Sequence, residues 1–174
     1  MNRRKKTALL MLVSLCAASL ALATPEDRNK PITGKADTNT MDANSGKTVL
    51  IGQVVITQGA LIIYADKVTI ETDPVTDQLS YLLAEGKPVR LFDQPVADGE
   101  MVQVQGLRVE FFPNENKIIT LGQAQVTQVG NKAEGERIIY LTDTGVMTIE
   151  SERAITGQPG GKQAELLIQP EAVN

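Results

Sequence analysis

Histidine and tryptophan are absent from this chain of 174 residues, and Cys16 is its only cysteine. Without histidine the chain cannot build a Ser-His-Asp or Cys-His catalytic centre, and a single thiol cannot form a zinc site. The sequence also contains no glycine-rich phosphate loop and no Gly-Lys-Ser/Thr motif. Among the common catalytic arrangements, only carboxylate pairs remain to be considered.

Two carboxylate pairs stand close together in the sequence. Asp73 and Asp77 flank Pro74, and Asp93 and Asp98 lie on either side of a short Pro-containing segment. Both pairs have turn-like surroundings, where acidic side chains usually contact water. We therefore expect no catalytic dyad, no metal site and no cofactor, and we expect that the protein is not an enzyme.

The N-terminus has the features of an export signal. Residues 3–6 are basic, residues 8–23 form an apolar run, and Ala21 and Ala23 are the small residues that a signal peptidase requires. We predict a signal peptide over residues 1–23, so the mature chain is expected to be exported.

Two alternatives to this cleaved signal stay open. The run could be an uncleaved membrane anchor, although it is shorter than the roughly 20 residues that cross a bilayer. Cys16 could carry a lipid, although Leu15 stands where a lipoprotein signal has a small residue.

Cleavage after Ala23 would leave an acidic chain without cysteine. Thirteen basic residues would then face twenty-one acidic ones. This charge argues against nucleic acid as a partner, because such binding requires Lys and Arg to neutralise phosphates. We expect a flexible segment over residues 24–30, one domain over 31–170 and a tail over 171–174, with no disulfide to stabilise them.

Apolar and polar residues alternate along "GQVVITQGALIIYADKVTI", which covers residues 52–70. Successive side chains of a strand point to opposite faces, so the pattern predicts strands with one apolar face. A weak internal repeat links Gly52-Gln53 to Gly122-Gln123, with Gly86 and Gly106 between them. Similarity at intervals of about thirty-five residues predicts an all-β stack of antiparallel hairpins.

Residues 75–84 allow two interpretations. Val75, Leu79 and Leu82 fall on one helical face, but a strand from Gln78 to Ala84 would lead into Gly86 as other strands lead into Gly52 and Gly122. We favour the strand. A last strand is expected over residues 164–168.

With three Phe, three Tyr and no Trp, the apolar face must be lined mainly by Val, Ile and Leu. Such a face can be closed by a second sheet, as in a packed β-sandwich, or it can stay open for a ligand. Smooth aliphatic walls suit acyl chains, because each buried methylene contributes about 0.8 kcal/mol. Alternation alone leaves both interpretations open.

The segments "GQVVITQGALIIYADKVTI", "EGKPVRLFDQ", "LGQAQVTQ" and "GERIIYL" resemble the OstA-like family of periplasmic lipopolysaccharide-transport proteins. The similarity runs from about Pro31 to Pro170, and Thr33-Gly34-Lys35 departs from a more apolar first strand. The resemblance implies a twisted antiparallel β-jellyroll, built from repeated hairpins and open at both ends.

The resemblance also implies a function. Such a protein shields the acyl chains of lipopolysaccharide in an apolar groove and assembles head to tail. It passes the lipid from an inner-membrane-anchored partner of the same fold to an outer-membrane translocon. An assembly or adaptor module that binds no lipid is the alternative. Carried over to this sequence, the groove would be lined by Ile32, Leu50, Val54, Ile56, Leu61, Ile63, Val89, Leu91, Val109, Phe111, Val126, Ile138 and Tyr140.

Overall fold

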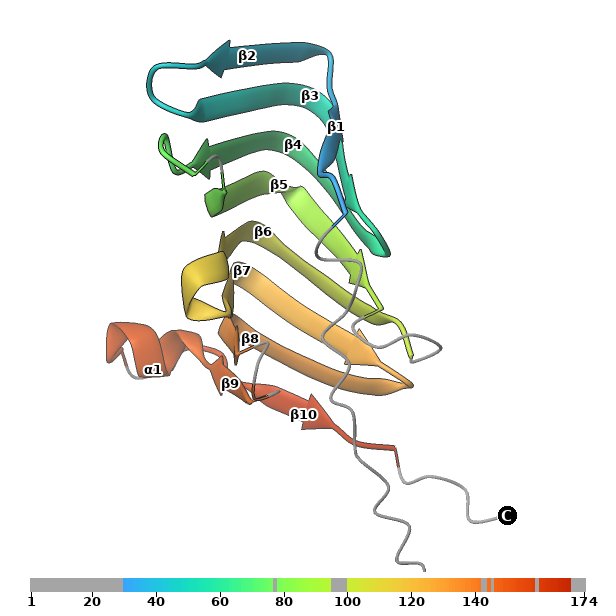
Figure 1. Cartoon of the computed structure of the whole chain (residues 1–174). Coiled ribbons are helices and arrows are strands. Elements are labelled where there is room, and N and C mark those ends of the chain that lie inside the picture. The colour runs from blue at the N-terminus through green and yellow to red at the C-terminus, as the bar shows by residue number, and fades with distance from the viewer. Residues whose placement is uncertain are drawn as a thin grey trace, which may run out of the picture.

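The computed structural model describes residues 30–169 except 77, 95–99, 142, 143, 145 and 159. These residues form one ten-stranded antiparallel sheet that folds into an open β-jellyroll (Figure 1). The predicted all-β fold is therefore confirmed. The predicted signal peptide, nearly all of the flexible segment and the C-terminal tail lie outside the described residues.

The strands follow one another along the sheet nearly in sequence order. Two short helices, η2 (Pro113–Glu115) and α1 (Glu152–Thr156), lie between strands. The strands are β1 (Thr33–Lys35), β2 (Thr38–Asp42), β3 (Lys47–Gln58), β4 (Leu61–Thr72), β5 (Leu79–Asp93), β6 (Val102–Phe112), β7 (Lys117–Gln128), β8 (Asn131–Leu141), β9 (Met147–Glu150) and β10 (Glu165–Leu167).

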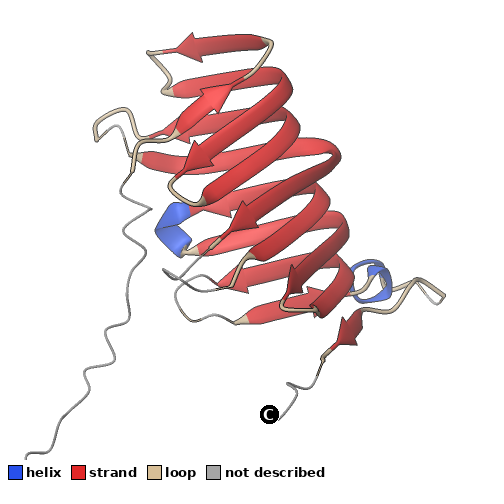
Figure 2. Ribbon diagram, turned by 90° about the vertical axis from the view of Figure 1, so that its right-hand side faces the viewer, coloured by secondary structure: helices blue, strands red, loops and turns tan. Residues whose placement is uncertain are grey.

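The long strands β3 to β8 each bend near their middle, and the bends form one corner across the sheet (Figure 2). The pairing register shifts there, as it does at β-bulges. Gly52 and Gln53 have φ values of 85° and 45°, and Gly122 and Gln123 have 73° and 52°. The Gly-Gln repeat of the sequence therefore marks the corner, where the first residue of each pair must adopt a left-handed conformation.

The corner divides the sheet into two arms that face each other. Arm A consists of residues 38–42, 47–51, 67–72, 79–85, 108–112, 117–121, 137–141 and 147–150. Arm B consists of residues 33–35, 54–58, 61–65, 89–93, 102–106, 124–128, 131–135 and 165–167.

Each end of the sheet has two short strands, one in each arm. At one end β1 and β2 pair with the two parts of β3, and at the other end β10 and β9 pair with the two parts of β8. All of these pairings are antiparallel, so the chain direction alternates at every step from one end to the other.

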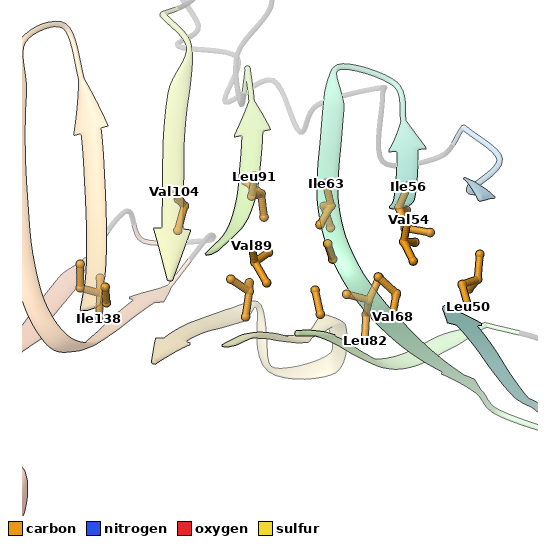
Figure 3. Close-up of a cluster of buried hydrophobic side chains, with 14 of the residues drawn as sticks. Leu50, Val54, Ile56, Ile63, Val68, Leu82, Val89, Leu91, Val104 and Ile138 are labelled. Atoms are coloured by element: carbon orange, nitrogen blue, oxygen red, sulfur yellow. The ribbon is translucent and has the colours of Figure 1, made fainter. Parts of the chain in front are cut away.

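The core lies between the inner faces of the two arms (Figure 3). Val68 and Val109 of arm A and Ile56 and Val89 of arm B are among the residues almost completely removed from water. Because the interior contains mainly aliphatic side chains, its stabilisation comes from apolar area and not from ring contacts.

Within the segment that had two interpretations, residues 79–84 form the first part of β5, so the strand interpretation is confirmed there. Asp73 makes a turn before it, since its carboxylate accepts hydrogen bonds from the backbone N–H groups of Val75 and Thr76, both at 2.9 Å. The predicted last strand is confirmed as β10. Asp77 and Asp98, the second members of the two carboxylate pairs, lie outside the described residues.

Candidate functional site

The inner face of arm A carries two rows of side chains that cross the sheet from end to end. We call the row nearer the corner the corner row and the row nearer the strand ends the lip row. The corner row is Asn39, Leu50, Val68, Ala84, Val109, Thr120, Ile138 and Ile149, and the lip row is Met41, Thr48, Ile70, Leu82, Phe111, Ile118, Tyr140 and Met147.

Arm B presents an equivalent row toward arm A. This middle row is Gly34, Ile56, Ile63, Leu91, Val104, Val126, Ala133 and Leu166. The rows of the two arms therefore form an aliphatic slot that runs across the strands from β3 to β8, with its long axis perpendicular to them.

A hollow opens between the arms in the part of the slot near β3 to β7. Its described lining residues are apolar except for Gln58 and Asp93. They are Ile32, Ile56, Gln58, Leu61, Ile63, Leu79, Leu82, Leu91, Asp93, Val109, Phe111 and Ile118.

The hollow is narrow, with a cavity volume of about 20 Å³. A single water needs about 10–15 Å³ by the same measure, so an acyl chain does not fit without movement of the arms or of their side chains. The lining is mainly aliphatic, as predicted. The space between the two arms is smaller than a groove that admits an acyl chain requires.

The predicted groove residues fall into three groups. Seven of them line the hollow: Ile32, Ile56, Leu61, Ile63, Leu91, Val109 and Phe111. Leu50, Val54, Val89, Val126 and Ile138 belong to the buried core but do not line the hollow. Tyr140 lies in the lip row between Ile118 and Met147 and is half-buried. Which of the thirteen contact a lipid stays a prediction.

Sequence reasoning missed five lining residues, of which Gln58 and Asp93 are polar and Leu79, Leu82 and Ile118 are apolar. Leu79 and Leu82 belong to the segment that allowed a helix, so alternation did not assign them to a face of the sheet. Ile118 follows the turn that contains η2, and a run of two isoleucines does not reveal which of them points inward. Alternation counted backward from Thr120 gives its direction, but the burial of Thr120 is known only from the structure.

Charged groups gather on the outer face. Lys67 pairs with Glu85 at 3.3 Å, and Arg137 of β8 pairs with Glu150 of β9. The hydrogen bond from Arg137 lowers the pKa of the Glu150 carboxyl below its usual value. Burial, together with the nearby Glu110, raises the pKa of the outward-facing Tyr81. These shifts belong to outer-face contacts and lie away from the slot.

The described residues contain no group of three His, Cys, Asp or Glu side chains that could hold a metal ion. Within the same part of the chain, neither helix is long and apolar enough to cross a membrane. The geometry offers an apolar surface between two arms, and Asp93 is the one charged residue among its described lining residues. These features define the chain as an open β-jellyroll with an apolar interior slot.

Comparison with known proteins identifies its family. Residues 35–146 match the family described as "LptA/(LptD N-terminal domain) LPS transport protein". The chain belongs to this family, as its sequence resemblance implied.

Three relatives illustrate the similarity. The chain is 33% identical to the lipopolysaccharide export system protein LptH of Pseudomonas aeruginosa, over 92% of this chain and 91% of the relative. It is 29% identical to LptA of Escherichia coli K12, over 93% and 84%. The crystal structure of LptH, titled the LptA homologous periplasmic component of the lipopolysaccharide transport device of P. aeruginosa, superposes with a TM-score of 0.73. It is 30% identical and covers 84% of this chain and 100% of that one.

Proposed function

We propose that this protein is a periplasmic lipopolysaccharide-binding bridge that holds acyl chains between its two arms. It takes lipopolysaccharide from an inner-membrane-anchored partner of the same fold and delivers it to an outer-membrane translocon. The observation that carries the proposal is the aliphatic lining of both arms, which continues in register from β3 to β8. Membership in a family of lipopolysaccharide transport proteins supports it.

Binding requires the slot to open, because the hollow has a volume of only about 20 Å³. The corner is suited to act as the hinge, since glycines with positive φ stand at Gly52 and Gly122 and the ladders are already interrupted there. Opening exposes apolar side chains, and entering acyl chains cover them again. Each methylene that leaves water contributes about 0.8 kcal/mol, so a chain of roughly ten methylenes supplies about 8 kcal/mol against this opening.

The slot has no charged lining except Asp93 among the residues that the structure describes. Phosphates and sugars of the head group would therefore lose hydration inside it without gaining partners. We infer that they stay at the mouth, outside the arms, while the acyl chains enter.

Assembly uses the two ends of the sheet. Within the described part of the chain, the outward edges of β1, β2, β9 and β10 pair with no further strand. An unpaired edge has backbone donors and acceptors that a strand of another chain can satisfy. Because the two ends differ, copies join head to tail and the contact does not close on itself. The slot then continues from one copy to the next.

The chain acts by binding and has no catalytic step in this proposal. Export follows from the predicted signal peptide over residues 1–23. The competing function, an adaptor that assembles without lipid, predicts the same edge contacts but no ligand in the slot.

Native mass spectrometry of the purified protein, with and without added lipopolysaccharide, separates the two functions. We expect complexes with one lipid per slot, and no complexes with the isolated core oligosaccharide, which lacks acyl chains. Equal binding of both ligands, or of neither, would reject the slot as the binding site. Light scattering of the same samples reports independently whether copies of the chain assemble.

A further inference from the structure

The lip row of arm A ends at both edges of the sheet on an exposed methionine. Met41 of β2 is 73% exposed, and Met147 of β9 is 36% exposed. Both side chains point to the inner face, because Met41 lies opposite Thr48 and Met147 lies opposite Tyr140. A single copy therefore leaves apolar side chains in water at the two points where its slot stops.

Chain direction allows one copy to continue the sheet of another. The step formed by β9 and β10 runs from arm A to arm B, and the step formed by β1 and β2 runs from arm B to arm A. Placing β9 of one copy beside β2 of a second copy therefore gives an antiparallel pair, as at every other step. Continuing the rows without a shift puts Met147 opposite Met41.

The same alignment places Leu166 of one copy beside Gly34 of the next in arm B. Leu166 of β10 is 64% exposed and belongs to the middle row, as does Gly34 of β1 at the other edge. Gly34 carries no side chain, and a Cβ there would lie 2.8 Å from Leu50 Cδ2. Leu50 and Ile56 of the same copy therefore already occupy the inner side of Gly34, and Leu166 of the neighbouring copy would pack beside them.

We propose that copies of this chain join through a methionine seam, formed by Met147 of one copy and Met41 of the next, which completes the lip row across the junction. This inference rests on the proposed function and specifies its assembly register. The seam keeps the slot apolar where two copies meet, so an acyl chain does not encounter water there. Methionine suits the position because its unbranched, polarisable side chain adapts to irregular surfaces.

Cysteine pairs test the seam directly. Directly opposite residues of antiparallel strands have Cα atoms about 4.5–5.5 Å apart, within the range that a disulfide spans. A Cys16→Ser background removes the only native thiol. Mixing the Met41→Cys protein with the Met147→Cys protein under mild oxidation should give a covalent dimer of one copy of each. Neither variant alone should form a covalent dimer, because each then has only one thiol at the junction.

Neighbouring positions provide the matched control. Thr40 and Thr148 are next to the two methionines but face outward. Thr40→Cys mixed with Thr148→Cys should also form a dimer, because these residues face each other in the same register. Met41→Cys mixed with Thr148→Cys should not, because the two thiols lie on opposite faces. Circular dichroism verifies that each variant is folded.

The outcomes separate the seam from the proposed function. Oligomers in light scattering without a disulfide between the Met41→Cys and Met147→Cys proteins would overturn the register, as would a disulfide between two copies of the Met41→Cys protein. A chain that stays monomeric at all concentrations would overturn both seam and head-to-tail assembly, while lipid binding by the monomer would still be measured by native mass spectrometry. A seam disulfide in a protein that binds no lipopolysaccharide would support the seam and reject the lipid function.

Discussion

Replacing Leu91 by Ala should destabilise the empty protein, and bound lipid should restore part of the loss. Leu91 of β5 is 4% exposed and lines the hollow. Leu50 of β3 is 2% exposed, belongs to the same core and does not line the hollow, so Leu50→Ala is the matched control. Without lipid, each substitution should lower the free energy of unfolding by about 2–5 kcal/mol, as Leu-to-Ala changes in cores do.

Lipid should distinguish the two variants. Leu has three more carbon atoms than Ala, and an acyl chain that fills the vacated space returns about 0.8 kcal/mol per methylene. Lipopolysaccharide should therefore stabilise Leu91→Ala by about 2 kcal/mol more than it stabilises the wild type. It should stabilise Leu50→Ala no more than the wild type, because the acyl chain does not reach that cavity.

Urea unfolding followed by far-ultraviolet circular dichroism measures these differences, since the chain has no Trp to report unfolding by fluorescence. Each variant is titrated with and without saturating lipopolysaccharide. An equal lipid effect in both variants and the wild type would refute the reasoning, because Leu91 would then be an ordinary core residue.

Three further predictions concern the corner and the edges. In urea unfolding, Gly122→Ala should lower the stability more than Gly157→Ala does. Both glycines have positive φ, but only a Cβ at Gly122 would meet another side chain, that of Leu107 at 3.0 Å. Equal losses would show that backbone strain is the only cause. Glu150→Gln removes the ion pair with Arg137 and should lower the free energy of unfolding at pH 7 by less than about 1 kcal/mol, as is typical of an exposed ion pair. The melting temperature should fall accordingly. This difference should vanish as the pH falls through the lowered pKa of the Glu150 carboxyl, and a gap that persists in acid would contradict the assignment. Oxidation of Met41 and Met147 to sulfoxides by hydrogen peroxide should shorten oligomers in light scattering, whereas the Met→Leu variant of both should resist.

Much of the fold could be predicted because its signals are local. Alternation with a period of two identified the strands and the inward position of residues such as Val54 and Ile63, both of which are buried. The repeat of Gly52 and Gly122 was recognised, but its meaning was not. Its role at the corner depends on register shifts between neighbouring strands, and a single sequence does not specify which residues pair.

The site could be predicted in part for a related reason. Alternation along a strand determines whether a side chain points inward. Whether that side chain lines the hollow depends on its distance from the opposite arm. Val89 and Leu91 are both buried and inward, yet only Leu91 of the two lines the hollow. The narrowness of the slot has the same origin, since the angle between the arms is a property of the whole sheet.

The apolar residues at the two edges of the sheet are visible in the sequence, but the sequence does not show that they lie at edges. Met41, Met147 and Leu166 look unremarkable among other apolar residues. Their importance follows from their place in rows that reach both ends of the sheet and from their exposure there.

Photo-cross-linking from two phenylalanines tests most directly whether acyl chains lie between the arms. Phe111 of β6 lines the hollow. Phe92 of β5 is also half-buried but faces outward, where its ring packs edge-on against Tyr64 with the ring centroids 6.1 Å apart. Each is replaced by benzoylphenylalanine, and the folded protein is irradiated with lipopolysaccharide. The account predicts cross-links to the acyl chains from position 111 and none from position 92. Cross-links from position 92 alone, or equally from both, would contradict it.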